Sequence, residues 1–264
     1  MGDLAIDAAV AGGDGSYTAK LSPEWAAWGP VGGYLAAILA RAAQAHSDHT
    51  RVASLTCHFL SVGRFDAVEL EVATLRRARR AESVRVVMRQ DDKPIAEGLV
   101  WLVADDLAGL AHDAARMPAV PGPEALRSWT ELQPDAEEPP MWNNIDSRPP
   151  RWPERPGTEA YTDGWYRFLA HTDDDLGREL VLLDVLGSGA VWMRHGPELE
   201  YVTPNLDLSV QFHRPAPPGT EWLYAEAFAD VAEGGLVGFR SKVWSRDGLL
   251  LASGSGQLLC RRPG

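Results

Sequence analysis

The sequence has little that would cross-link a chain or hold a metal. Only two cysteines, Cys57 and Cys260, stand among its 264 residues. Two thiols cannot form a structural metal site alone, and in a reducing compartment we expect them to stay unpaired. Two common catalytic patterns are also missing. No serine stands in the Gly-x-Ser-x-Gly pattern of a nucleophile elbow, and no histidine pair has zinc spacing on a helix.

Basic charge is scarce as well. Lysine and arginine total 25 against 37 aspartate and glutamate residues, which gives a net charge of −12. Phosphate contacts supply most of the affinity of general nucleic-acid binders, so this acidity disfavours that class. The apolar runs fall well short of the roughly 20 residues that a membrane span needs. The start, Met1-Gly2-Asp3-Leu4, is acidic where a signal peptide is basic, so we expect a cytoplasmic protein without a membrane span.

Proline divides the chain into three zones. The middle zone, residues 105–164, is dense in prolines. Because proline removes a backbone donor and interrupts strand pairing, we expect a surface linker with at most a short helix near residues 124–131. The predicted division is therefore an N-terminal unit of residues 1–104, the linker of residues 105–164, and a C-terminal unit of residues 165–264.

One helix is predicted clearly, over residues 34–45, directly after a glycine-rich turn. Nearly all of these residues favour helix, and most of the circumference is apolar. A helix with so little polar surface is expected to be buried, and we expect a curved sheet to wrap around it. Alternating and apolar runs predict strands at residues 55–60, 68–74, 83–90 and 95–103, and the short turns between them favour an antiparallel sheet.

The C-terminal unit repeats this order. Aligning Phe59 with Phe212 places residues 54–59 on residues 207–212, and the second hairpin then aligns with Ala96 on Ala252. A helix candidate at residues 179–186 precedes the second copy, as the first helix precedes the first. Any two antiparallel hairpins share part of this pattern, but the shared order of helix, strand and hairpin favours a repeat. A joint between two copies is where ligand sites tend to form.

Three segments carry a family resemblance. The helix start Trp28-Gly29-Pro30-Val31-Gly32-Gly33-Tyr34, the strand Leu206-Asp207-Leu208-Ser209-Val210-Gln211-Phe212-His213-Arg214-Pro215, and the hairpin Asp247-Gly248-Leu249-Leu250-Leu251-Ala252-Ser253 resemble TesB-like acyl-CoA thioesterases. The resemblance implies an α+β double hotdog, in which each of two long helices is wrapped by an antiparallel sheet. It also implies hydrolysis of acyl-CoA to a free acid and coenzyme A, with no metal or other cofactor.

In that family an Asp, a Thr and a Gln hold and activate the attacking water. Asp207 matches the Asp and is the predicted base, although a strand-start turn with a capping carboxylate would look the same. Gln257 is the candidate Gln, yet the family position falls on Gly256. A bulge within residues 254–256 would be needed to turn Gln257 to the required face.

The remaining candidates are less specific. Spacing places Asp230 where the family has its Thr. If Asp230 points into the site, two carboxylates would share it and one would be driven neutral. Ser209 and Ser255 are the other residues that could supply the missing hydroxyl. The backbone amides of Gly32, Gly33 and Tyr34 are predicted to bind the thioester carbonyl, and the alternative is a tight turn with glycines for packing.

The basic run that includes Arg79 and Arg80 either binds the phosphates of coenzyme A or forms a solvated hairpin turn. A non-catalytic protein that binds acyl-CoA or another hydrophobic ligand on the same scaffold is the alternative function. We also expect the chain to form a homo-oligomer through exposed edges or faces of the sheet.

Overall fold

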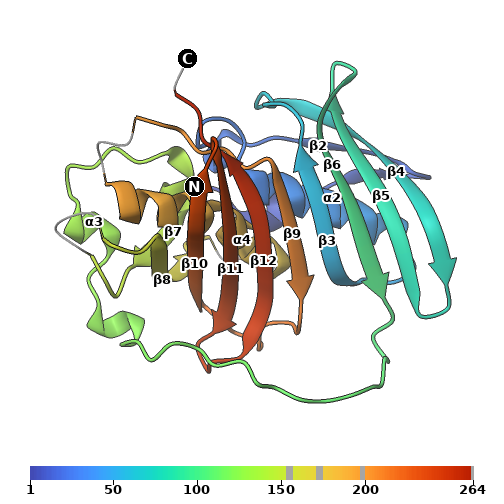
Figure 1. Cartoon of the computed structure of the whole chain (residues 1–264). Helices are drawn as coiled ribbons and strands as arrows, with labels where there is room; N and C mark the ends of the chain where they lie inside the picture. Colours follow the sequence, from blue (N-terminus) through green and yellow to red (C-terminus); the bar gives the residue numbers. More distant parts are fainter. Residues whose placement is uncertain (153–156, 171–174, 197–199, 263–264) are drawn as a thin grey trace.

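The computed structural model describes residues 1–152, 157–170, 175–196 and 200–262. Within them the chain forms one twelve-stranded antiparallel sheet with two long helices on one face (Figure 1). The strands lie in the order β1-β2-β4-β5-β6-β3-β9-β12-β11-β10-β8-β7. The strands are β1 (Ala11–Gly13), β2 (Ser16–Lys20), β3 (Arg51–Phe59), β4 (Ala67–Ala78), β5 (Ala81–Gln90), β6 (Lys93–Val103), β7 (Ile145–Arg148), β8 (Tyr161–Phe168), β9 (Asp207–Phe212), β10 (Trp222–Glu233), β11 (Leu236–Ser245) and β12 (Leu250–Leu259).

The two long helices are the centre of the molecule. They are α2 (Gly32–His46) and α4 (Asp175–His195), and the short helices are α1 (Leu4–Asp7), η1 (Pro23–Trp25), η2 (Pro123–Ala125), α3 (Trp129–Leu132) and η3 (Pro140–Asn144). Helix α2 is buried along most of its length, as its alanine-rich, apolar sequence predicts. The two helices touch so closely that a β-carbon at Gly33 would lie 2.4 Å from the carbonyl oxygen of Leu180.

The predicted double hotdog is confirmed: each half of the sheet covers one helix. The internal repeat also agrees with the strand register. Phe59 pairs with Ala96 between β3 and β6, and Phe212 pairs with Ala252 between β9 and β12. The two halves join where β3 pairs with β9, and the aligned residues Thr56 and Ser209 face each other there. A pseudo-twofold axis therefore passes through the middle of the joint.

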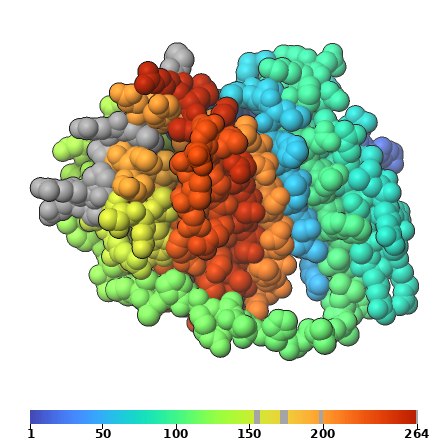
Figure 2. Space-filling model, viewed as in Figure 1, coloured from blue at the N-terminus to red at the C-terminus, as the bar shows by residue number. Residues whose placement is uncertain are grey.

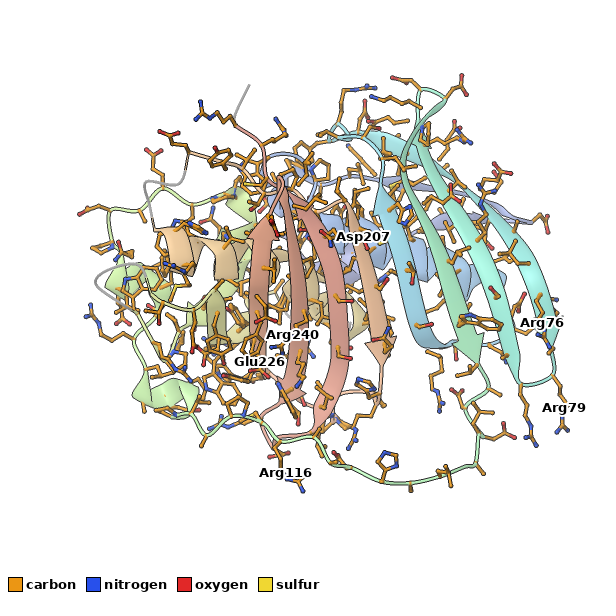
Figure 3. The ribbon with its side chains drawn as sticks, viewed as in Figure 1. Arg76, Arg79, Arg116, Asp207, Glu226 and Arg240 are labelled. Atoms are coloured by element: carbon orange, nitrogen blue, oxygen red, sulfur yellow. The ribbon has the colours of Figure 1, made fainter. Side chains whose placement is uncertain are left out.

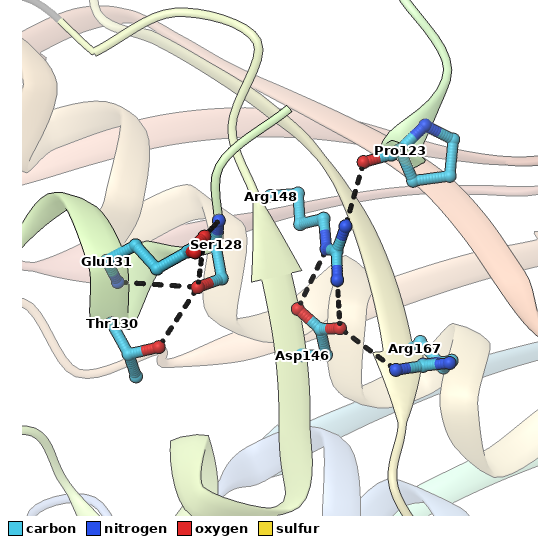
Figure 4. A network of polar contacts seen from close by, with 7 residues as sticks. All are labelled: Pro123, Ser128, Thr130, Glu131, Asp146, Arg148 and Arg167. Carbon is cyan, nitrogen blue, oxygen red and sulfur yellow. Dashed lines mark hydrogen bonds and ion pairs between the residues drawn. The ribbon is translucent and has the colours of Figure 1, made fainter. Parts of the chain in front are cut away.

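The proline-rich segment is more structured than predicted. Within residues 105–164 lie β7 and the beginning of β8, which extend the C-terminal half of the sheet. Figure 4 shows how this segment is attached: Asp146 accepts hydrogen bonds from Arg148 and Arg167, and Arg148 donates to the carbonyl of Pro123 at 3.0 Å. Both guanidinium groups also lie 5.0 Å from the ring centre of Trp222. Partly buried ion pairs and the packing of guanidinium groups on an indole ring thus attach the segment, although its prolines form few backbone hydrogen bonds.

The same segment covers part of the outer face of the sheet, which we define as the face away from α2 and α4. Four aromatic side chains of the C-terminal half form a cluster on this face: Trp165, Trp222, Tyr224 and Trp244. Apolar side chains of the segment, Met117 and Leu126 among them, pack against the cluster. The indole N–H of Trp165 donates to the carbonyl of Pro121 at 2.8 Å. No helix among the described residues is long and apolar enough to cross a membrane.

Candidate active site

Several segments that carry predicted site residues meet at one end of the central strands. The last residue of β3, Phe59, donates its backbone N–H to Leu206, just before β9. Leu206 in turn donates to the carbonyl of Gln257 on β12 at 2.8 Å. The start of α2 lies at the same end, with Gly32 packed against the ring of Phe59. A β-carbon at Gly32 would lie only 2.7 Å from that ring. The structure therefore brings Asp207, Gln257 and the glycines of α2 to the same end of the sheet.

Asp207 begins β9 (Figure 3). It lies opposite His58 of β3. Its neighbours Leu208 and Val210 point inward to the helices, whereas the side chain of Asp207 is partly buried and turns along the sheet toward β12. One carboxylate oxygen accepts the backbone N–H of Gln257 at 3.0 Å. The other oxygen has no hydrogen-bond partner among the described residues. The carboxylate thus caps the end of the β9–β12 ladder and keeps one oxygen open to solvent.

Gln257 reaches Asp207 through its backbone and not through its side chain. The side chain is exposed, and its amide nitrogen lies 3.7 Å from where a β-carbon of Gly238 would be, on β11. The bulge predicted within residues 254–256 is not there, because those residues pair regularly with β11. The register shifts earlier in β12, beside Val243 and Trp244. The side chain therefore leans over β11, on the far side of β12 from Asp207.

The start of α2 presents fewer open amides than predicted. The Gly33 N–H donates to a carboxylate oxygen of Asp184 at 2.7 Å, so that amide is already occupied. Tyr34 is fully buried, and its hydroxyl donates to the carbonyl of Asp7 at 2.7 Å. The N–H of Gly32 has no acceptor among the described residues, and Gly32 is only partly buried. Of the three predicted carbonyl-binding amides, the one on Gly32 is the most accessible, because Gly33 and Tyr34 are buried.

Asp184 is the residue that sequence analysis missed. It lies on α4, fully buried, and it accepts hydrogen bonds from Gly33 and from the side-chain amide of Asn205. Burial raises the pKa of its carboxyl group to about 6, although both hydrogen bonds oppose the shift. A signal was present in the sequence: a single carboxylate interrupts the apolar run of residues 180–186. A lone acid on an otherwise buried helix face needs a polar partner.

Asp230 does not join the cluster, which corrects the prediction that two carboxylates share the site. It lies on β10, and β11 and β12 separate that strand from β9. Three strand spacings amount to about 14 Å. Asp230 is exposed and forms an ion pair with Arg240 at 3.2 Å.

Arg79 and Arg80 also lie away from Asp207, in the turn between β4 and β5. His58, opposite Asp207, is level with Glu97 on β6, which pairs with Val87 on β5. From Val87 back to Arg80 the strand covers about 23 Å, and Figure 3 shows Arg79 at the other end of the sheet from Asp207. The two arginines therefore form a solvated hairpin turn and do not contribute to this site.

Cys57 lies beneath the site, and its chemistry can be predicted. Its thiol is completely buried on β3, and its pKa is raised first by burial and then by the nearby carboxylates of Asp184 and Asp207. A neutral thiol is a poor nucleophile, so we expect Cys57 to be inert in the native protein. A thiol reagent should modify Cys57 only after denaturation, which mass spectrometry of the labelled peptides will show. Rapid modification of Cys57 in the folded protein would contradict this expectation.

The fold places the chain among the hotdog proteins. A solved protein from Alicyclobacillus acidocaldarius described as having a hot dog fold matches with a TM-score of 0.78 and 20% identity, over 99% of this chain and 98% of that one. A proposed thioesterase II from Thermobifida fusca matches with a TM-score of 0.84 and 21% identity, over 98% and 97%. An acyl-CoA thioesterase II from Mycobacterium marinum matches with a TM-score of 0.79 and 21% identity, over 99% of both chains.

The sequence itself matches two family descriptions that together span most of the chain. Residues 21–103 match the acyl-CoA thioesterase N-terminal domain, and residues 105–259 match the acyl-CoA thioesterase C-terminal domain. The chain belongs to the acyl-CoA thioesterase family. A search of curated proteins finds no match.

Proposed function

We propose that this protein hydrolyses acyl-CoA with a water molecule activated by Asp207, and that the Gly32 N–H binds the thioester carbonyl. The observation that carries the proposal is the meeting of Asp207 with the start of α2 at one end of the joint. A carboxylate that accepts a single backbone N–H retains an oxygen that can take a proton from water. An open amide at a helix N-terminus stabilises the negative charge that develops on the carbonyl oxygen.

The chemistry needs no covalent nucleophile from the protein. Water attacks the thioester carbonyl carbon while Asp207 takes one of its protons, and the tetrahedral intermediate carries its charge beside Gly32. Collapse of that intermediate breaks the carbon–sulfur bond, and the departing thiolate of coenzyme A takes the proton from Asp207, which returns Asp207 to its ionised form. We propose Ser209 and Ser255 as the hydroxyls near the water, because they pair across β9 and β12, two residues from Asp207 and Gln257.

Exposed apolar side chains lie near this end of the joint, and they favour a substrate with a hydrophobic acyl group. The exposed side chains are those of Trp28, Leu60, Val62 and Leu206. Val62 contacts the turn at Gly29, next to Trp28. Leu60 follows Phe59, whose backbone N–H donates to the carbonyl of Leu206. We propose that the acyl chain lies on this rim. The closely packed contact of α2 with α4 leaves no room for the chain between the helices at Gly33.

The proposed activity is tested with purified protein and a series of acyl-CoAs of increasing chain length. Release of coenzyme A is followed with a thiol reagent and the free acid by mass spectrometry. We expect turnover that improves with chain length until the rim is filled. The alternative is a non-catalytic protein that binds acyl-CoA. It is favoured by the direction of the Gln257 side chain and by the absence of the family Thr, and tight binding of acyl-CoA without release of thiol from any substrate would support it.

We also propose that a second copy of the chain covers the outer face of the N-terminal half. Leu99 and Trp101 point outward from β6 and are 45% and 40% exposed, whereas residues near 115–126 cover the aromatic cluster of the C-terminal half. Figure 2 shows the strands of the N-terminal half uncovered on this face. The Arg85–Glu97 ion pair shares this face, so the contact that we propose is centred on the exposed side chains of Leu99 and Trp101.

Trp101→Glu tests the proposed assembly, because it places a charge in the apolar patch without changing the core. We expect light scattering coupled to size exclusion to report a dimer or larger for the native chain and a monomer for the variant. Lys93→Glu, at the exposed start of β6, is the matched control and should leave the assembly intact. A native chain that is monomeric at micromolar concentration would overturn the proposal.

A further inference from the structure

The carboxylate of Asp184 joins three segments that lie far apart in the sequence. One oxygen accepts the N–H of Gly33, at the start of α2, at 2.7 Å. The other accepts the side-chain amide of Asn205, which also donates to the Asp184 backbone carbonyl at 3.1 Å. Asn205 stands two residues before Asp207. A single buried acid of α4 therefore connects the helix start that would bind the carbonyl with the segment that carries the base.

We propose that Asp184 is a positioning residue, which holds the first turn of α2 and the Asn205–Asp207 segment in the geometry that hydrolysis requires. The proposal rests on the proposed function, because it assigns a role in that same site. Asp184 is buried, and its side chain accepts hydrogen bonds from Gly33 and Asn205. Its effect passes through Gly33 to the neighbouring Gly32, and through Asn205 to Asp207.

The arrangement needs the ionised acid. Two N–H donors face the two oxygens, and a carboxylate accepts from both. A protonated acid would present its own O–H to one of these donors, so one of the two hydrogen bonds would be lost. The negative charge also interacts favourably with the positive end of α2. Burial raises the pKa of Asp184 to about 6, so the ionised form predominates at pH 7 and is lost as the pH falls through 6.

The titratable groups around Asp184 and Asp207 include Cys57 and its neighbour His58, which pairs with Asp207 between β3 and β9. The thiol of Cys57 on β3 lies close to both Asp184 and Asp207, and burial keeps it neutral. The carboxylate of Asp207 on β9 is the other charged group near that thiol. The first turn of α2 carries no acidic residue. A change near pH 6 that disappears when Asp184 is replaced is thus attributable to Asp184.

The substitutions follow from the donor and acceptor pattern. In Asp184→Asn the amide oxygen can still accept from Gly33, but its NH2 group faces the NH2 group of Asn205. The swap Asp184→Asn with Asn205→Asp restores a donor opposite an acceptor. Ser188→Ala is the matched control: Ser188 lies one turn further along α4 and bonds the carbonyl of Thr203, not the start of α2.

Two measurements on the full chain test the proposal. In kinetics between pH 5 and 8, Asp184→Asn should lower kcat about 10- to 100-fold with KM nearly unchanged, and remove the loss of activity near pH 6. The swap should recover most of kcat, and Ser188→Ala should stay within twofold of the native protein. In NMR spectra, the Gly33 amide should titrate near pH 6 in the native protein and not in Asp184→Asn.

The two readouts separate this inference from the proposed function. A native chain that hydrolyses no acyl-CoA but shows the Gly33 titration would refute the proposed function and leave Asp184 as the group that holds α2. An active chain whose kcat and pH profile do not change in Asp184→Asn would overturn the inference. A Gly33 amide that does not titrate in the native protein would overturn it as well, whatever the activity.

Discussion

Replacing Asp207 with asparagine is expected to lower kcat by about 10³-fold, which corresponds to about 4 kcal/mol of transition-state stabilisation. The amide oxygen can still accept the N–H of Gln257, so the ladder between β9 and β12 should remain intact. What is lost is the ability to take a proton from water. Steady-state release of coenzyme A, measured beside a thermal denaturation curve, separates this chemical loss from loss of fold.

Asp230→Asn is the matched control for that result. Asp230 is also a carboxylate on a strand of the C-terminal half, but it pairs with Arg240 on β11 and lies about 14 Å from β9. We expect the control to keep activity within twofold. If Asp207→Asn retained a tenth or more of the native kcat, Asp207 would not be the base.

The largest effect on stability is expected for Gly33→Ala. A β-carbon there would lie 2.4 Å from the Leu180 carbonyl oxygen and 2.5 Å from the α-carbon of Val181. Both neighbours are backbone atoms of α4, so the two helices would have to move apart. We expect a loss of about 3 kcal/mol or more in the free energy of unfolding, seen as a fall of roughly 6–12 °C in Tm.

Gly13→Ala is the matched control for this substitution. Gly13 lies on the exposed edge strand β1, and no atom comes within 4 Å of its β-carbon position. Its unfolding free energy should change by no more than about 0.5 kcal/mol. Equal stability of the Gly33 and Gly13 variants would show that α2 and α4 are not in close contact in solution.

Much of the fold follows from local patterns. The helix predicted over residues 34–45 corresponds to α2 because its residues favour helix and are apolar on nearly every side. The repeat alignment of Phe59 with Phe212 predicted equivalent strand registers because alternation fixes which face each residue occupies. The strands at residues 145–148 and 161–168 were not predicted, since the prolines around them hid short strands held by side-chain contacts.

The candidate site was less accessible to sequence reasoning, for physical reasons. The acceptor of the Gly33 N–H stands 151 positions away, and no local pattern reports a contact at that separation. The direction of the Gln257 side chain depends on where a bulge falls, and it falls nearer the start of β12 than expected. Arg79 lies in the turn between β4 and β5, whereas Asp207 lies at the other end of the sheet on β9, with β6 and β3 between. Only the register of the whole sheet reveals this separation.

The pairing of β3 with β9 bears on the ancestry of the reactive centre. Around the axis between Thr56 and Ser209, the counterpart of Asp207 is Ser54, which lies opposite Gln211. A strictly symmetric ancestor would have carried two identical centres, one at each end of the seam. This chain keeps an acid at one end and a serine at the other. The proposed centre at Asp207 therefore has no matching acid at the symmetry-related end, and substitutions at Ser54 should leave hydrolysis at Asp207 unaffected.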